Sequence, residues 1–187
     1  MQAQSAKTLI PALSREEKVV LTLESERVLL VFSVGKQLAA LPLENVQRIA
    51  PMAQLARPPG LPSPLEGILN LRGTAVPVLR LDRLLRLPVQ ETGLYSMLIV
   101  LKGHVDGAFA LLVERTSEVR SVPLGDFLPV DRADSFNACA EASFVLRGET
   151  VTLLSPRRLL LEKETQALAE FRTLARRRIE EWGAADQ

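Results

Sequence analysis

The side chains that most often carry out enzyme chemistry are sparse in this chain. There is one histidine, His104, and one cysteine, Cys139, so a metal site of nitrogen and sulfur ligands cannot be assembled within a single chain. His104 stands in a polar turn beside Asp106, and we interpret it as a solvated turn residue, not a phosphoacceptor or general base. Neither the Gly-x-Ser-x-Gly nucleophile elbow nor the phosphate loop Gly-x-x-x-x-Gly-Lys-Ser/Thr occurs. The sequence therefore predicts a protein that is not an enzyme and that holds no metal and no cofactor.

Arginine offers binding chemistry instead. Arg72 lies in the stretch N-L-R-G at 70–73 and returns as Arg147 in a second copy of that stretch. The planar guanidinium with its five donors suits either contact with a partner or bracing of the protein's own structure, and the sequence leaves both open. Further arginines crowd a segment near the C-terminus, namely Arg172, Arg176, Arg177 and Arg178. Because glutamates accompany them, we interpret them first as a solvated helix face, and second as a surface for an acidic partner or a membrane.

Composition excludes several functional classes. The 187 residues carry a net charge of +1, so no overall field draws the protein to DNA or to an acidic membrane. Aromatic residues make up only 4%, too few for a platform on which bases stack. A single cysteine fits a reducing compartment, and no apolar run approaches the ~20 residues of a membrane-spanning helix. We expect a cytoplasmic protein with no membrane insertion and no nucleic-acid partner.

The chain is organised around a stretch that occurs twice. Residues 71–85 and 146–160 match at a constant offset of 75, with eight of the fifteen positions identical. In each copy an Arg-Gly pair marks a tight turn, because glycine adopts the positive φ that sharp reversals need. A strand follows at 75–79, and Asp82 then opens a short helical turn.

Each copy is preceded by a hairpin and a third strand. Residues 28–43 and 98–113 each predict a strand, a turn and a strand, and Asp106-Gly107 is a pair favoured in tight turns. A third strand follows each hairpin, at 43–49 and 118–122, and then a connection that contains prolines. These two equivalent sets of short strands predict a mainly β fold of two five-stranded SH3-like β-barrels related by a pseudo-two-fold axis.

Residues 162–182 differ in character from the rest. No glycine or proline interrupts them, and their apolar residues fall on one helical stripe, with Gly183 just past its end. We predict a long C-terminal α-helix that packs on the barrels. The alternative is a helix that contacts a partner or pairs with a second copy, through Phe171, Arg176 and Trp182.

The resulting domain organisation has four parts. We predict a flexible N-terminal tail, two barrel subdomains that divide near 86–97, the C-terminal helix and a short tail, with bounds at 1–17, 18–161, 162–182 and 183–187.

The signature around the first copy resembles a known family. The run G-I-L-N-L-R-G at 67–73, followed by V-P-V at 76–78, is similar to the CheW-like domain, and the resemblance covers residues 28–161. It implies two five-stranded barrels around a shared core. It also implies a non-catalytic adaptor that couples the cytoplasmic tips of chemoreceptors to a CheA-type histidine kinase, whose own regulatory domain has the same fold. One departure is Arg48, which stands where the family often has an acidic residue.

The resemblance also implies where partners bind. Val46 and Ile49 would contact the receptor tip, the region of Arg72 would contact the regulatory domain of the kinase, and the full set of expected partner-binding residues is Val46, Arg48, Ile49, Asn70, Arg72 and Gly73. Two other functions stay open: a homo-oligomeric assembly protein that self-associates through the C-terminal helix, and a small-barrel nucleic-acid-binding protein, which the composition disfavours.

Overall fold

The structure, a computed structural model, describes residues 25–61, 63–89, 91–102, 107–131 and 138–160, together with residues 169, 170, 173 and 177. Strands make up most of this part of the chain, and η1 and η2 are single 3-10 turns. In chain order the elements are β1 (Glu26–Val34), β2 (Gln37–Pro42), η1 (Leu43–Asn45), β3 (Val46–Pro51), β4 (Leu65–Leu71), β5 (Thr74–Arg80), α2 (Leu81–Leu84), β6 (Met97–Leu101), β7 (Phe109–Val113), β8 (Arg115–Pro123), η2 (Leu124–Asp126), β9 (Ala140–Leu146) and β10 (Glu149–Leu154).

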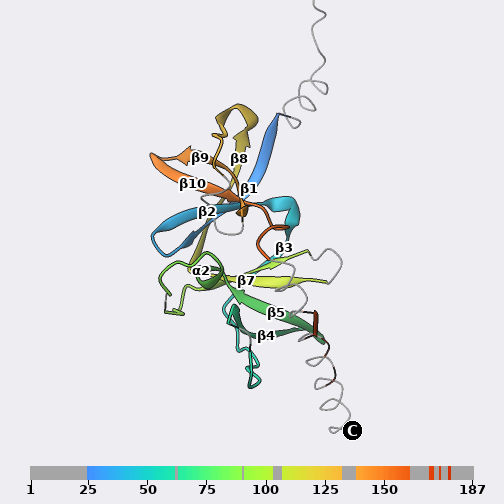
Figure 1. The fold of residues 1–187 in the computed structure, drawn as a ribbon. Helices are drawn as coiled ribbons and strands as arrows, with labels where there is room; N and C mark the ends of the chain where they lie inside the picture. The colour runs from blue at the N-terminus through green and yellow to red at the C-terminus, as the bar shows by residue number, and fades with distance from the viewer. Residues whose placement is uncertain are drawn as a thin grey trace, which may run out of the picture.

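The strands form two five-stranded sheets, which lie one above the other in Figure 1. The first sheet has the order β8-β1-β2-β10-β9, and the second has the order β3-β6-β7-β5-β4. Each sheet takes a hairpin from one half of the chain and three strands from the other half. The loop near residues 86–97 therefore separates the two copies of the repeat, whereas each sheet contains strands from both copies.

The internal repeat is visible in the backbone of the hairpins β4–β5 and β9–β10. Arg72 and Gly73 turn the first hairpin with φ values of 52° and 84°, and Arg147 and Gly148 turn the second with 52° and 85°. Each hairpin also contains one residue that the strand register skips, Glu66 in β4 and Glu141 in β9, and these two residues are 75 positions apart. Because turns and bulges recur at the same offset, the two copies follow the same backbone path.

The prediction of two closed barrels is wrong. In both sheets the two edge strands do not pair with each other. One isolated bridge in each sheet, Ala56–Ile68 and Leu128–Ser143, joins an edge strand to the segment that follows the third strand of the repeat. That segment cannot continue as a regular ladder because it contains prolines, which lack the N–H donor; they are Pro58, Pro59 and Pro64 in one copy and Pro129 in the other. The result is a mainly β fold of two open five-stranded sheets.

The prediction of a long C-terminal helix is also wrong for the part of the chain that the structure describes. Within 162–182 only Ala169, Glu170, Thr173 and Arg177 are described, and their helical backbone geometry does not make up a continuous helix. An apolar stripe indicates which face a helix would bury, but a helix is stable mainly through the packing of that face. Phe171, Arg176 and Trp182 lie outside the described residues. Among the described elements, no helix combines the length and the apolar character needed to cross a bilayer.

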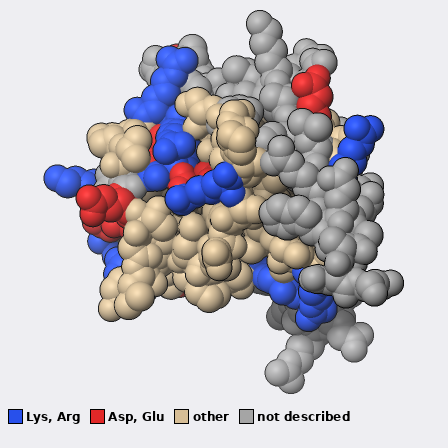
Figure 2. Space-filling model, turned by 90° about the horizontal axis from the view of Figure 1, so that it is seen from below, with Lys and Arg blue, Asp and Glu red and all other residues tan. Residues whose placement is uncertain are grey.

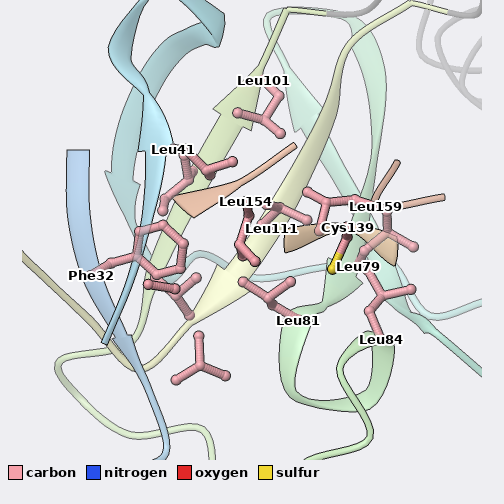
Figure 3. Packing of buried hydrophobic residues seen from close by; sticks show 14 of the residues in the cluster. Phe32, Leu41, Leu79, Leu81, Leu84, Leu101, Leu111, Cys139, Leu154 and Leu159 are labelled. Atoms are coloured by element: carbon pink, nitrogen blue, oxygen red, sulfur yellow. The ribbon is translucent and has the colours of Figure 1, made fainter. Parts of the chain in front are cut away.

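Apolar side chains are buried on both faces of each sheet. The largest cluster lies between the sheets, and Figure 3 shows side chains of both sheets and of α2 directed into it, including Phe32, Leu41, Leu154, Leu79, Leu101, Leu111, Leu81 and Leu84. The opposite face of each sheet carries a cluster of its own, one around Val31 and Phe144 and one around Val78 and Leu98. Burial on two faces explains why β1, β6 and β7 are continuous apolar runs and do not alternate with polar residues.

Candidate functional site

The first candidate site is the turn between β4 and β5. Leu71 and Thr74 close the hairpin, and the two residues between them both have positive φ, as the tight turns that match the twist of a hairpin require. The Asn70 side chain holds this turn, because its Oδ1 accepts a hydrogen bond of 2.8 Å from the backbone N–H of Gly73. Asn70, Arg72 and Gly73 are all exposed. The turn therefore presents the Arg72 side chain to solvent on a fixed backbone.

The side-chain cap of Asn70 has no equivalent in the second copy, where Val145 stands 75 residues later and is 61% exposed. We expect Asn70→Ala to lower the free energy of unfolding by about 1 kcal/mol, because one hydrogen bond to a backbone donor is lost. Val145→Asn is the matched variant that adds the hydrogen bond to the second copy. It should raise the free energy of unfolding by up to about 1 kcal/mol if the new side-chain amide accepts a hydrogen bond from the backbone N–H of Gly148. Urea unfolding followed by circular dichroism measures both, and equal stabilities of wild type and Asn70→Ala would contradict the role of the cap.

The second candidate site is the edge strand β3, which pairs only with β6. Val46 lies opposite Leu101 and Ile49 lies opposite Ile99, and both partners belong to the cluster between the sheets. Val46 is half-buried, Ile49 is 38% exposed and Arg48 is exposed. At this edge the shared core therefore reaches the surface as a pair of apolar side chains beside an arginine, the composition of a protein–protein contact.

In the strand order the six expected partner-binding residues fall into these two groups. β3 and β4 are the two edges of the second sheet, with three strands between them. Asn70, Arg72 and Gly73 are local to the turn at one edge, while Val46, Arg48 and Ile49 are local to the strand at the other.

A surface groove beside the start of β1 is absent from the sequence-based expectations. Its lining residues are Glu26, Arg27, Val28, Pro42, Leu43 and Glu44. Val28 is 43% exposed, and Val119 on the neighbouring edge strand β8 is 52% exposed. Val119 lies opposite Leu30, a member of the cluster between the sheets, and Val28 is two residues from Leu30 on the same face. The shared core thus reaches the surface a second time, at the edge of the first sheet.

The sequence gives no signal that separates this groove from the core. Val28 is the first residue of an apolar run whose next six residues are mostly buried, yet its own side chain is 43% exposed. On the face of the molecule in Figure 2, basic and acidic residues lie around a broad area of other residues, and the basic residues cover more of this face than the acidic ones.

Groups that could react are few and dispersed in the part of the chain that the structure describes. His104 lies outside the described residues. Cys139 is buried at 2% exposure, and burial raises the pKa of its thiol, which keeps it in the unreactive protonated form. Among the described residues, no three His, Cys, Asp or Glu side chains gather in a way that could hold a metal ion.

These features define a class: a two-sheet β module whose shared core reaches the surface at two sheet edges, as in a protein that works by binding other proteins. The family follows from comparison with known sequences. The model of the CheW-like domain matches residues 28–164, so the chain belongs to the CheW-like domain family.

The same fold occurs among solved structures. The scaffolding protein TtCheW from Thermoanaerobacter tengcongensis aligns with a TM-score of 0.66 over 86% of this chain and 94% of that chain, at 17% sequence identity. No curated protein matches the sequence.

Proposed function

We propose that this protein is a non-catalytic signalling adaptor that couples chemoreceptors to a CheA-type histidine kinase in a cytoplasmic chemosensory array. Membership of the CheW-like domain family supports this function. The main structural support for this function is that apolar side chains next to the shared core reach the surface at two separate places. These are Val28 and Val119 on the first sheet, and Val46 and Ile49 on the second. An adaptor has to hold two partners at once, and two separate surfaces with apolar anchors and charged rims meet that need.

The shapes of the two surfaces suit different partners. The groove at Val28 is hollow, and an amphipathic helix binds by laying its apolar face into such a groove. We therefore assign the helical receptor tip to the groove, where it fits better than at the β3 edge. An open strand edge suits a partner that is itself a β protein, because it offers unpaired backbone groups. We assign the regulatory domain of the kinase to β3.

Two single substitutions separate these assignments. Val119→Lys is expected to weaken binding of a receptor cytoplasmic fragment at least tenfold and to leave binding of the kinase regulatory domain within about twofold, because a charge then replaces an apolar anchor. Ile49→Lys is expected to do the reverse. Calorimetric titration of each variant with the receptor fragment and the kinase domain of the same organism measures both affinities.

Val89→Lys is the matched control, since Val89 is a 61% exposed valine that follows α2 and belongs to neither surface. Wild-type protein that binds neither partner at micromolar concentration would count against the adaptor function as a whole. Two variants that weaken both partners equally would leave the adaptor but remove the separate surfaces.

A further inference from the structure

Arg48 on β3 and Glu118 on β8 occupy equivalent places in the two sheets. Both follow directly on a residue that the register skips, Gln47 in one case and Ser117 in the other. The row of paired residues across each sheet shows the equivalence in full: Glu118–Val31–Ala40–Leu153–Ala142 in the first sheet and Arg48–Val100–Ala110–Val78–Gly67 in the second. Val78 and Leu153, and likewise Gly67 and Ala142, are 75 residues apart, which is the offset of the repeat.

In the first sheet, Glu118 forms an ion pair with a residue from the other edge of the sheet. Arg147, in the turn between β9 and β10, lies with its NH2 nitrogen 3.1 Å from Oε1 of Glu118. The curvature of the sheet therefore brings the turn at one edge to the strand at the other. Arg72 is the equivalent of Arg147 in the second sheet, with the same φ of 52° in the same turn. From this match in backbone and register we infer that the Arg72 side chain lies toward Arg48, at the place where the first sheet has a carboxylate.

The second sheet thus replaces an arginine–glutamate pair with two arginines. Both side chains are exposed, and neither forms a hydrogen bond or ion pair with another residue in the described part of the chain. Other arginines of the fold do have such partners: Arg27 pairs with Glu141, and Arg57 pairs with Glu66. Two like charges directed at one place repel each other, and an added carboxylate would relieve that repulsion.

We propose that Arg48 and Arg72 together bind a carboxylate from a partner protein, an acidic side chain on the regulatory domain of the kinase. The geometry of the first sheet supports a carboxylate, because the same frame there already holds glutamate. A folded β partner is supported by the neighbouring Ile49, which offers an apolar anchor, and by the open edge of β3. The site rests on the proposed function for the identity of the partner, but its geometry can be tested without any partner.

The test without a partner supplies the carboxylate within the chain. Arg48→Glu restores the arrangement of Glu118 and Arg147, so the midpoint of thermal unfolding should rise by about 1–3 °C at low salt and the gain should shrink at high salt. Glu118→Arg copies the two-arginine arrangement into the first sheet and should lower the midpoint by a similar amount. A midpoint that Arg48→Glu leaves unchanged or lowers would overturn the geometry.

The test with a partner uses the kinase regulatory domain as the probe and the full chain in every variant. We expect Arg48→Ala and Arg72→Ala each to weaken binding roughly three- to tenfold, and Arg48→Glu to weaken it more, because the new carboxylate occupies Arg72 and repels the partner. The loss should be largest at low salt. Arg120→Ala is the matched control: it removes the same charge from the exposed edge strand β8 and should change the affinity less than twofold.

The outcomes separate this site from the adaptor function. Wild-type binding that Arg48→Glu leaves unchanged would overturn the Arg48–Arg72 site and leave the adaptor function standing, whereas absence of wild-type binding would count against the function itself. Loss of receptor-fragment binding, and not of kinase binding, in the arginine variants would overturn the assignment to the kinase. Binding of labelled DNA at low salt that depends on both arginines would show that the anion is a phosphate and would overturn the carboxylate.

Discussion

Neither half of the chain is expected to fold alone. Expressed separately, residues 25–89 and 91–160 should each give the circular dichroism of an unfolded chain and no cooperative transition in urea. The reason is the exchange of strands: in the first fragment β1 and β2 belong to one sheet, and β3, β4 and β5 belong to the other. Cutting the chain removes four pairings, namely β1–β8, β2–β10, β3–β6 and β5–β7. What remains is two isolated hairpins and an unpaired strand, and an isolated hairpin is only marginally stable in water.

Mixing the two fragments should restore the fold, because every pairing that the cut removes is a pairing between the halves. The control is an intact chain with a protease site inserted at Leu94–Tyr95, where both side chains are exposed, at 92% and 75%. After cleavage the two pieces should stay together and unfold in one cooperative step. A single fragment that unfolds cooperatively on its own would contradict the observed strand order.

The features that could be predicted from the sequence are those set by local chemistry. The Arg-Gly turns need two positive φ values, and the constant offset of 75 residues carries the same turn into both copies. The hairpin β1–β2 follows from Gly35, whose φ is 60°, between two apolar runs. For the same reason the sequence predicted the Arg-Gly turn of the candidate site, and the structure adds the Asn70 side chain, whose Oδ1 accepts a hydrogen bond from the Gly73 backbone.

The features that could not be predicted depend on contacts between distant segments. Which half supplies the neighbour of β2 is decided by parallel pairing with β10, over 110 residues away, and no local pattern encodes it. Each sheet is open because its two edge strands do not pair with each other, and Val28 is exposed although it belongs to an apolar run; no local pattern marks either feature. The apolar stripe at 162–182 indicated an amphipathic face but not whether the fold provides a surface for it.

The equivalence of Arg48 and Glu118 depends both on the local sequence and on contacts between distant segments. The 75-residue offset does not align β3 with β8, because the loops that follow these two strands differ in length. The sequences of the two strands are also too dissimilar to be aligned by eye. Only the strand register aligns them, at an offset of 70. The departure of Arg48 from the family pattern was visible in the sequence, but its meaning came from the ion pair that the other copy retains.

A second large effect is expected at Arg80, at the end of β5. Its guanidinium is buried and forms two hydrogen bonds with the Asp82 carboxylate, of 3.0 Å from Nε and 2.6 Å from NH2. Glu66 lies 3.6 Å away and also faces Arg57 and Arg83. The hydrogen bonds to Asp82 raise the pKa of Arg80 above its ordinary value although burial opposes this, so the group stays charged. Removing one member of a buried pair leaves the other charge without adequate compensation.

We expect Arg80→Met to lower the free energy of unfolding by about 3–5 kcal/mol, the cost of breaking a buried ion pair. Urea unfolding at neutral pH measures this loss. Arg83→Met is the control, since its side chain is 35% exposed and its contact with Glu66 is longer, at 3.7 Å, so a loss below about 1 kcal/mol is expected.

The second copy of the repeat shows that the fold does not need a guanidinium at this place. At the offset of 75 residues, Ser155 is the equivalent of Arg80 and is also buried. The equivalent of Asp82 is Arg157, so this copy has neither the guanidinium of Arg80 nor the carboxylate of Asp82 at these two positions. If the destabilisation by Arg80→Met is due to the Asp82 carboxylate that is left without its partner, the double variant Arg80→Met/Asp82→Asn should have a free energy of unfolding at least about 1 kcal/mol higher than that of Arg80→Met. The amide of the new asparagine is neutral, and it still accepts the hydrogen bond that Asp82 receives from the Arg83 backbone. A double variant less stable than Arg80→Met would show instead that packing of the arginine side chain, and not its charge, stabilises this end of β5.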